Sequence, residues 1–92
     1  MSNNLSKNTR KILKETVTLD KAKLNLSYVI VDCGRRDKLR DRFAELGFVE
    51  GATVAVIKKA PLGDPLEVRV MNYRVCARAS ELRRFTVRQT DE

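Results

Sequence analysis

Residues 37–70 read DKLRDRFAELGFVEGATVAVIKKAPLGDPLEVRV, and this stretch holds a helix pattern followed by two strand patterns with a proline-bracketed loop between them. Leu39, Phe43 and Leu46 recur at the i, i+4 and i+7 spacing of one apolar helix face. The aspartate that opens the stretch can act as an N-cap, and the glycine that follows the last of these apolar residues can end the helix. A helix is therefore predicted over residues 37–46.

Strands are predicted on both sides of this helix, from runs of β-branched and apolar residues bounded by turn residues. They cover Ser27–Cys33, Ala52–Lys59, Leu66–Met71, Tyr73–Ala77 and Phe85–Arg88. Asn72 is expected to make a tight reversal between two of them, and Ser80–Arg84 to form one helical turn capped by Ser80. Antiparallel strands in so short a chain favour a partly closed barrel, because closure removes exposed sheet edges. The predicted fold class is mainly β: a small, partly open barrel with one short α-helix after the first strand and a helical turn before the last strand.

The loop that begins at residue 60 reads APLGDPLEV and contains both prolines of the chain. Pro61 and Pro65 fix their own φ angles, and Gly63 supplies a position where φ can be positive without steric cost. One interpretation is a rigid turn that only sets the register of the flanking strands. The other is a preorganised docking loop, which loses little entropy on binding and would present Leu62 as an exposed apolar anchor.

The length and the charge of the chain limit the classes of protein to which it can belong. The 92 residues fit one small domain, predicted over residues 17–88 between a basic flexible tail at 1–16 and a short C-terminal tail at 89–92. No apolar run approaches the roughly 20 residues that span a bilayer, and the N-terminus lacks an apolar signal segment, so a cytoplasmic protein is expected. The formal charge of +7 favours polyanionic neighbours: nucleic acid, an acidic protein face or anionic lipid.

The chain contains no histidine, which removes the commonest general base and the commonest transition-metal ligand. It has neither a nucleophile elbow nor a phosphate-binding Walker motif, so no enzymatic activity is predicted. Cys33 and Cys76 stand apart in the sequence and are interpreted as small buried core residues. Asp32, Cys33 and Asp37 are the best remaining metal-ligand candidates, and they are weak; the sequence predicts no metal site and no cofactor.

Three segments carry a resemblance to a known family: RDRFAELGFVEGATVAVIKKAPLGDPLEVRV from residue 40, NYRVCAR from residue 72 and SELRRFTV from residue 80. With a helix ending in ELGF, a PLGDP loop and a tyrosine turn, the chain resembles the FeoA family of small cytosolic components of bacterial ferrous iron transport systems, over roughly residues 17 to 88. The resemblance implies an SH3-like barrel. It also implies a non-catalytic role in ferrous iron uptake, together with the membrane transporter FeoB and its cytosolic GTP-binding domain. Asn25 and Asn72 stand where the family has glycine, and asparagine also tolerates left-handed backbone geometry.

The interpretation as an interaction module predicts contact residues in three places. They are Arg36, Arg40 and Glu45 in the helix, Leu62, Gly63 and Asp64 in the loop, and Tyr73 and Arg74 in the tyrosine turn. Contact would change the gating, the assembly or the nucleotide cycle of the transporter. In one interpretation the basic helix residues form a solvent-exposed face on which they are paired with acidic residues of the same helix. In the other they form an electropositive face that meets an acidic protein or an anionic membrane. A homo-oligomer is a further expectation, since oligomerisation adds stability to so small a core.

A basic barrel that binds nucleic acid is the alternative function, because positive charge favours polyanions. Proteins that bind single strands usually carry aromatic stacking platforms. Here the aromatic residues are scattered and stand mostly at positions expected in the core: Tyr28, Phe43, Phe48, Tyr73 and Phe85. Nucleic acid is therefore not the predicted partner.

Overall fold

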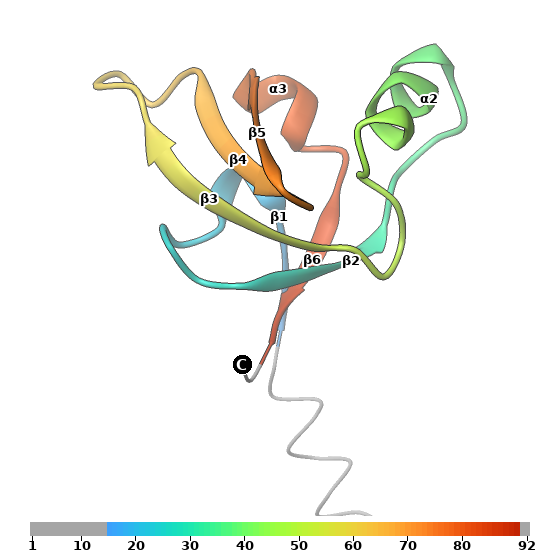
Figure 1. Ribbon diagram of the computed structural model, residues 1–92, viewed down its shortest axis with the longest axis horizontal. Coiled ribbons are helices and arrows are strands. Elements are labelled where there is room, and N and C mark those ends of the chain that lie inside the picture. Colours follow the sequence, from blue (N-terminus) through green and yellow to red (C-terminus); the bar gives the residue numbers. More distant parts are fainter. Residues whose placement is uncertain (1–14, 91–92) are drawn as a thin grey trace, which may run out of the picture.

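The computed structural model of the protein describes residues 15–90, so that nearly all of the predicted N-terminal tail lies outside the described residues. Figure 1 shows the elements, which run in the order β1 (Thr16–Thr18), η1 (Leu19–Lys21), β2 (Tyr28–Asp32), α2 (Lys38–Glu45), β3 (Thr53–Lys59), β4 (Leu66–Val70), β5 (Tyr73–Ala77), α3 (Ala79–Leu82) and β6 (Thr86–Gln89). Thr16 and Gln89, which the sequence places in the tails, are strand residues.

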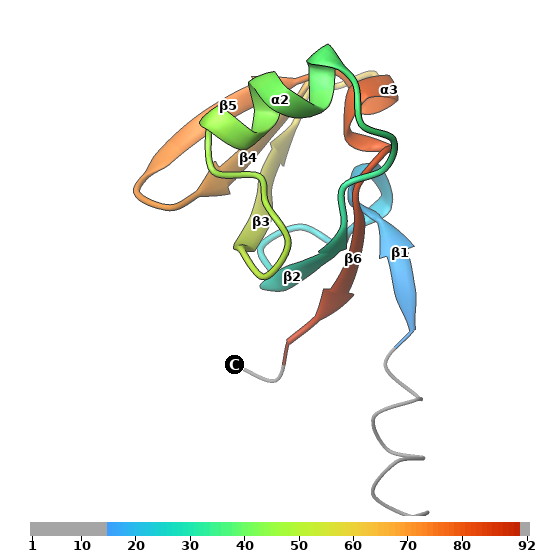
Figure 2. The ribbon, with the colours of Figure 1, turned by 90° about the vertical axis from the view of Figure 1, so that its right-hand side faces the viewer.

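The strands form one antiparallel sheet in the order β1-β6-β2-β3-β4-β5, and β1 and β5 are its edges. The sheet curls without closing, and α2 and α3 both lie over one of its open ends (Figures 1 and 2). Register shifts between Ile30 and Asp32 in β2, and between Val56 and Lys58 in β3, interrupt the regular ladder and let the strands bend. The predicted mainly β, partly open barrel is confirmed.

One strand was not predicted from the sequence. β1 pairs with β6 through Thr16 and Arg88, Val17 and Val87, and Thr18 and Thr86. As a consequence α2 follows the second strand of the barrel rather than the first. β1 has only 3 residues and its partner is the last strand of the chain, so it forms only where tertiary structure brings β6 alongside.

Three aromatic rings fix α2 onto the barrel. The ring centroid of Phe43 lies 5.1 Å from that of Phe48 and 5.3 Å from that of Phe85, with both pairs edge to face. Phe48 and Phe85 are fully buried, and Leu39 packs against the same core while partly exposed. Leu46 was expected to belong to this apolar face, but it is 37% exposed, because the helix has already ended at Glu45.

Asp37 caps α2 as predicted, since its Oδ1 accepts a hydrogen bond of 2.9 Å from the backbone N–H of Arg40. The other carboxylate oxygen accepts a hydrogen bond of 2.8 Å from the guanidinium of Arg84, which also donates to the carbonyl of Arg35 at 3.2 Å. The hydrogen bond from Arg84, followed by that from the Arg40 N–H, lowers the pKa of Asp37. These bonds tie the start of α2 to the segment that leads into β6.

The helical turn α3 begins one residue before the expected cap. Its N-cap is Arg78 rather than Ser80, and the backbone N–H of Arg78 donates 3.0 Å to Oε1 of Glu81. The first helical N–H, that of Ala79, donates 2.7 Å to Oδ1 of Asp64. The cap thus comes from a side chain far away in the sequence, which a local pattern does not reveal.

Two residues other than glycine have a positive φ among the described residues. Asn25 has a φ of 65°, as the asparagine at this position predicted. In the turn between β4 and β5 the positive φ, 56°, belongs to Met71 and not to Asn72. The pairing of Val70 with Tyr73 leaves a loop of two residues, and such loops favour a positive φ at their first residue, which here is a methionine.

Candidate functional site

An apolar groove runs between the C-terminal end of α2 and the strands β3 and β4. It has a volume of about 670 Å³. Its lining residues are Ser27, Ala44, Glu45, Gly47, Val49, Ala52, Thr53, Val54, Ala55, Arg69 and Met71. We call it the α2–β3 groove. Val49 is 45% and Met71 67% exposed, so apolar surface that the fold leaves in contact with solvent lines the groove.

The packing of the Met71 and Val70 side chains against Gly47 shapes one wall of the α2–β3 groove. Gly47 has a φ of +105°, and a Cβ added there would lie 2.8 Å from Sδ of Met71 and 3.2 Å from Cγ2 of Val70. Any larger residue here would have a strained backbone and would crowd the side chains of Met71 and Val70. The turn is therefore seated directly on the end of α2.

Tyr73 fastens the same contact with a hydrogen bond. Its hydroxyl donates to the carbonyl oxygen of Leu46 over 2.7 Å, which satisfies a carbonyl at the C-terminus of α2. The ring stays 44% exposed beside the groove. Of the predicted contact residues, Glu45 and Tyr73 are therefore brought together at one place, although the structure does not test whether either binds a partner.

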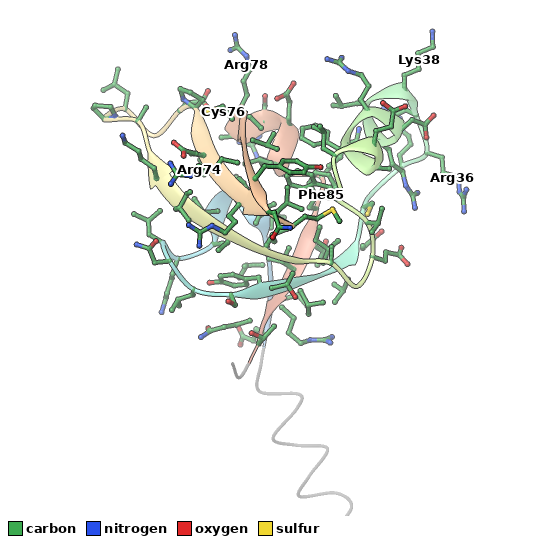
Figure 3. All side chains as sticks on the ribbon, viewed as in Figure 1. Arg36, Lys38, Arg74, Cys76, Arg78 and Phe85 are labelled. Carbon is green, nitrogen blue, oxygen red and sulfur yellow. The ribbon has the colours of Figure 1, made fainter. Side chains whose placement is uncertain are left out.

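The predicted basic residues divide into two kinds. Arg36 and Lys38 are exposed and point away from the start of α2 (Figure 3). Arg40 instead donates 3.0 Å to the carbonyl of Gly34, and thereby holds the loop before the helix. Arg74 lies on the outer face of β5, where it forms an ion pair of 3.0 Å with Glu67.

The remaining predicted contact residues lie at the far end of β3, in the segment 60–65, which we call the proline loop. Leu62 is 96% exposed. Gly63 has a φ of +89° and open space around it, and Asp64 is occupied as the cap of α3. Figure 1 shows the proline loop and the C-terminal end of α2 on opposite sides of the barrel, so the loop residues and the groove residues are apart.

The weak metal-ligand candidates each have another partner. Oδ1 of Asp32 accepts a hydrogen bond from the Gly34 N–H, and Asp37 is held by Arg84. The thiol of Cys33 is buried, lies 3.7 Å from the carbonyl oxygen of Phe48, and has its pKa raised by burial. Within residues 15–90 no three His, Cys, Asp or Glu side chains gather into a metal-binding group.

Cys76 was interpreted as buried, and this interpretation is wrong. It is exposed, because its pairing with Glu67 puts it on the outer face of β5 together with Arg74. Cys33 is buried as predicted.

Sequence reasoning missed Val49 and Met71 as residues of the site. The signal for Val49 was an apolar residue in the turn after the helix, outside any strand or helix pattern. Met71 was assigned to the end of a strand, and only its place in the turn shows that its side chain faces the groove.

The aromatic residues offer no stacking platform in the described part of the chain. Tyr28, Phe43, Phe48 and Phe85 are buried, and Figure 3 shows Phe85 inside the barrel. Tyr73 is exposed but fixed by its hydrogen bond. The helices of residues 15–90 are also too short and too polar for any of them to cross a bilayer.

The small, curled and partly open antiparallel sheet, with short helices over one open end, defines a protein of the SH3-like barrel class. The chain belongs to the FeoA domain family, which matches residues 17–89. This confirms the resemblance seen in the sequence. The family consists of small non-catalytic accessory proteins of iron transport, in line with the prediction that the chain is not an enzyme.

Several known proteins are similar to this chain. The Fe(2+) transport protein A/Fe(2+) transporter FeoB fusion protein of Porphyromonas gingivalis is 41% identical over 59 residues, which are 64% of this chain and 7% of the fusion protein. The chain therefore spans only a small part of that relative. The crystal structure of Stenotrophomonas maltophilia FeoA complexed with zinc, described as a prokaryotic SH3 domain protein, is 36% identical, covers 77% of this chain and 88% of its own, and has a TM-score of 0.69. The solution structure of FeoA from Chlorobium tepidum is 31% identical, covers 83% of this chain and 74% of its own, and has a TM-score of 0.75.

Proposed function

We propose that the protein is a cytoplasmic accessory component of ferrous iron uptake and that it acts by contact with the cytosolic part of a FeoB-type transporter. The fused relative carries this proposal, because one polypeptide there joins a sequence similar to this chain to the transporter FeoB. Fusion holds two domains at a high effective concentration, as expected for domains that work on each other. Ferrous iron is the cargo of this system.

The α2–β3 groove is the surface that we assign to this contact. Its apolar rim at Val49 and Met71 can bury an apolar side chain of the partner, while Glu45 and Arg69 on its walls can pair with polar groups beside that side chain. Arg36 stands near the start of the same helix and extends the contact as a free cation toward an acidic surface.

Rigidity of the groove supports the assignment. The turn between β4 and β5 is fixed on α2 by the packing against Gly47 and by the hydroxyl of Tyr73. A partner therefore meets a preformed site, and little conformational entropy is lost on binding. Contact of this kind can bias the gating, the assembly or the nucleotide cycle of the transporter, and measurement of GTP hydrolysis with and without the chain separates the last of these from the other two.

The test is titration of the isotope-labelled chain with the purified cytosolic domain of the transporter. Chemical shift changes are expected at residues of the α2–β3 groove. Val49→Asp should weaken binding at least about tenfold, because it places a charge in the apolar rim. Leu24→Asp is a matched control, since Leu24 is also 45% exposed but lies outside the groove. Equal affinities of the two variants would remove the groove from the contact, and no binding of the unchanged chain would end the proposal.

A further inference from the structure

The proline loop presents a leucine that the fold does not use. Leu62 is 96% exposed, so that its side chain contributes almost nothing to the core. The loop is held without it: the Gly63 N–H donates 2.7 Å to the carbonyl of Ala60, and the Ala60 N–H donates 3.0 Å to the carbonyl of Pro65. Asp64 adds the bond to α3. A polar residue would serve this turn equally well, so the Leu62 side chain is available for a contact outside the fold.

Cations surround this leucine. Lys58 and Lys59 end β3 immediately before the loop, and Arg78 lies between β5 and α3 and points outward (Figure 3). All three are exposed and form no ion pair with another residue of 15–90. The apolar tip of the loop is thus flanked by three positive charges, on Lys58, Lys59 and Arg78, that are unpaired within residues 15–90.

The acidic residues of this end are already engaged in the fold. Asp64 accepts the hydrogen bond that caps α3, and Glu81 accepts one from the Arg78 N–H. Glu67 is paired with Arg74. They therefore do not pair with the side chains of Lys58, Lys59 or Arg78, although their negative charge reduces the local excess of positive charge.

A second exposed leucine follows a lysine in the segment between η1 and β2. Lys23 is exposed and Leu24 is 45% exposed, and Figure 1 shows this segment below the proline loop, on the side of the barrel away from α2. The Asn25 N–H donates 2.8 Å to the carbonyl of Val56 and so holds this segment on β3. The side of the barrel away from α2 therefore carries two exposed leucines, each with lysines nearby in the sequence.

We propose that this side of the barrel docks on an anionic lipid bilayer, with Leu62 inserted at the level of the headgroups and Lys58, Lys59 and Arg78 against lipid phosphates. A projecting side chain needs a complementary pocket on a protein, whereas lipid adapts to any convex shape. Stable attachment to a membrane takes an apolar and an electrostatic contribution together, and both occur at this loop. The surface lies away from the α2–β3 groove, so lipid and a protein partner can be bound at once.

The experiment is flotation of the full chain with vesicles of phosphatidylcholine alone, and of phosphatidylcholine mixed with phosphatidylglycerol. Binding is expected only to the mixed vesicles and should weaken as salt is raised. Leu62→Ala should lower the partition coefficient on the order of tenfold. Lys58→Ala together with Lys59→Ala should lower it about fivefold per lysine. Since these residues are exposed, circular dichroism should show an unchanged fold.

Matched controls separate the loop from the net charge. Lys11→Ala with Lys14→Ala removes two cations from the sequence before the barrel, and Val49→Ala removes apolar surface at the groove. Both should affect vesicle binding less than the loop variants do. The proposal would be overturned if the unchanged chain did not bind mixed vesicles. It would also be overturned if the two lysine pairs had equal effects and Leu62→Ala left vesicle binding unaffected. The proposal would also be overturned if the Leu62→Ala variant bound vesicles normally but no longer bound the cytosolic domain of the transporter, because the leucine would then be a protein contact. The vesicles contain no protein, so binding to them is tested independently of the proposed function.

Discussion

The substitution Gly47→Ala tests the contact that shapes the α2–β3 groove. The new Cβ would lie 2.8 Å from Sδ and 3.1 Å from Cγ of Met71, and 3.2 Å from Cγ2 of Val70. Met71 is 67% exposed and can swing aside, but Val70 is fully buried and cannot. Overpacking of this kind costs about 1–3 kcal/mol. The φ of +105° adds about 1–3 kcal/mol for any residue with a side chain.

Gly51→Ala is the control, because Gly51 has a similar φ of +91° but nothing within 4 Å of an added Cβ. It should therefore show the backbone cost alone. In a domain of this size about 1 kcal/mol shifts the melting temperature by about 4–8 °C. We expect Gly47→Ala to melt at least about 5 °C below Gly51→Ala when unfolding is followed by circular dichroism.

Met71→Ala in the Gly47→Ala background should recover part of this difference, since it removes the nearer of the two clashes. The contact with Val70 would remain. If Gly47→Ala and Gly51→Ala melted together, the turn between β4 and β5 would not be seated on α2, and the rigid groove inferred from that contact would be refuted.

Three further outcomes follow from individual contacts. Tyr73→Phe should lower the free energy of unfolding by about 1 kcal/mol in urea titrations, because it removes one hydrogen bond to the end of α2. The hydrogen bonds from Arg84 and then from the helix N–H lower the pKa of Asp37. The stability that the Asp37 carboxylate contributes is therefore complete above the unfolded pKa of about 4 and is lost as pH falls through the lower folded pKa. Asp37→Asn still caps the helix and should flatten this acid dependence of the free energy of unfolding. In the folded protein a thiol reagent should modify Cys76 at once and Cys33 only on unfolding, since burial raises the pKa of the Cys33 thiol, and equal rates for both would contradict the burial described here.

The sequence predicted those features that depend on neighbouring residues. The helix α2, with its N-cap at Asp37 and a glycine directly after its C-cap, follows from spacing and residue type. The strand β5 was predicted with its observed bounds, Tyr73–Ala77. Exposure of Cys76 could also have been predicted. Successive residues of a strand face opposite sides of the sheet, so Cys76 must point outward if the apolar residues on both sides of it point into the core.

Features that depend on distant residues could not be predicted in the same way. β1 exists only through β6, and the cap of α3 comes from Asp64 across the barrel. The α2–β3 groove depends on Tyr73 reaching the carbonyl of Leu46. None of these contacts leaves a periodic or compositional signal, because each joins segments that are adjacent only after folding.

The pairing of β1 with β6 determines how the barrel can be tethered. Thr16 lies opposite Arg88, so the polypeptide enters and leaves the domain at one corner of the sheet (Figure 2). A larger protein joined at either end would hold the barrel by the same corner, away from α2. This permits rotation about a single attachment point while the groove stays accessible. A short peptide bridging the two ends, with new termini opened in the loop between η1 and β2, would give a circularly permuted barrel with the same sheet.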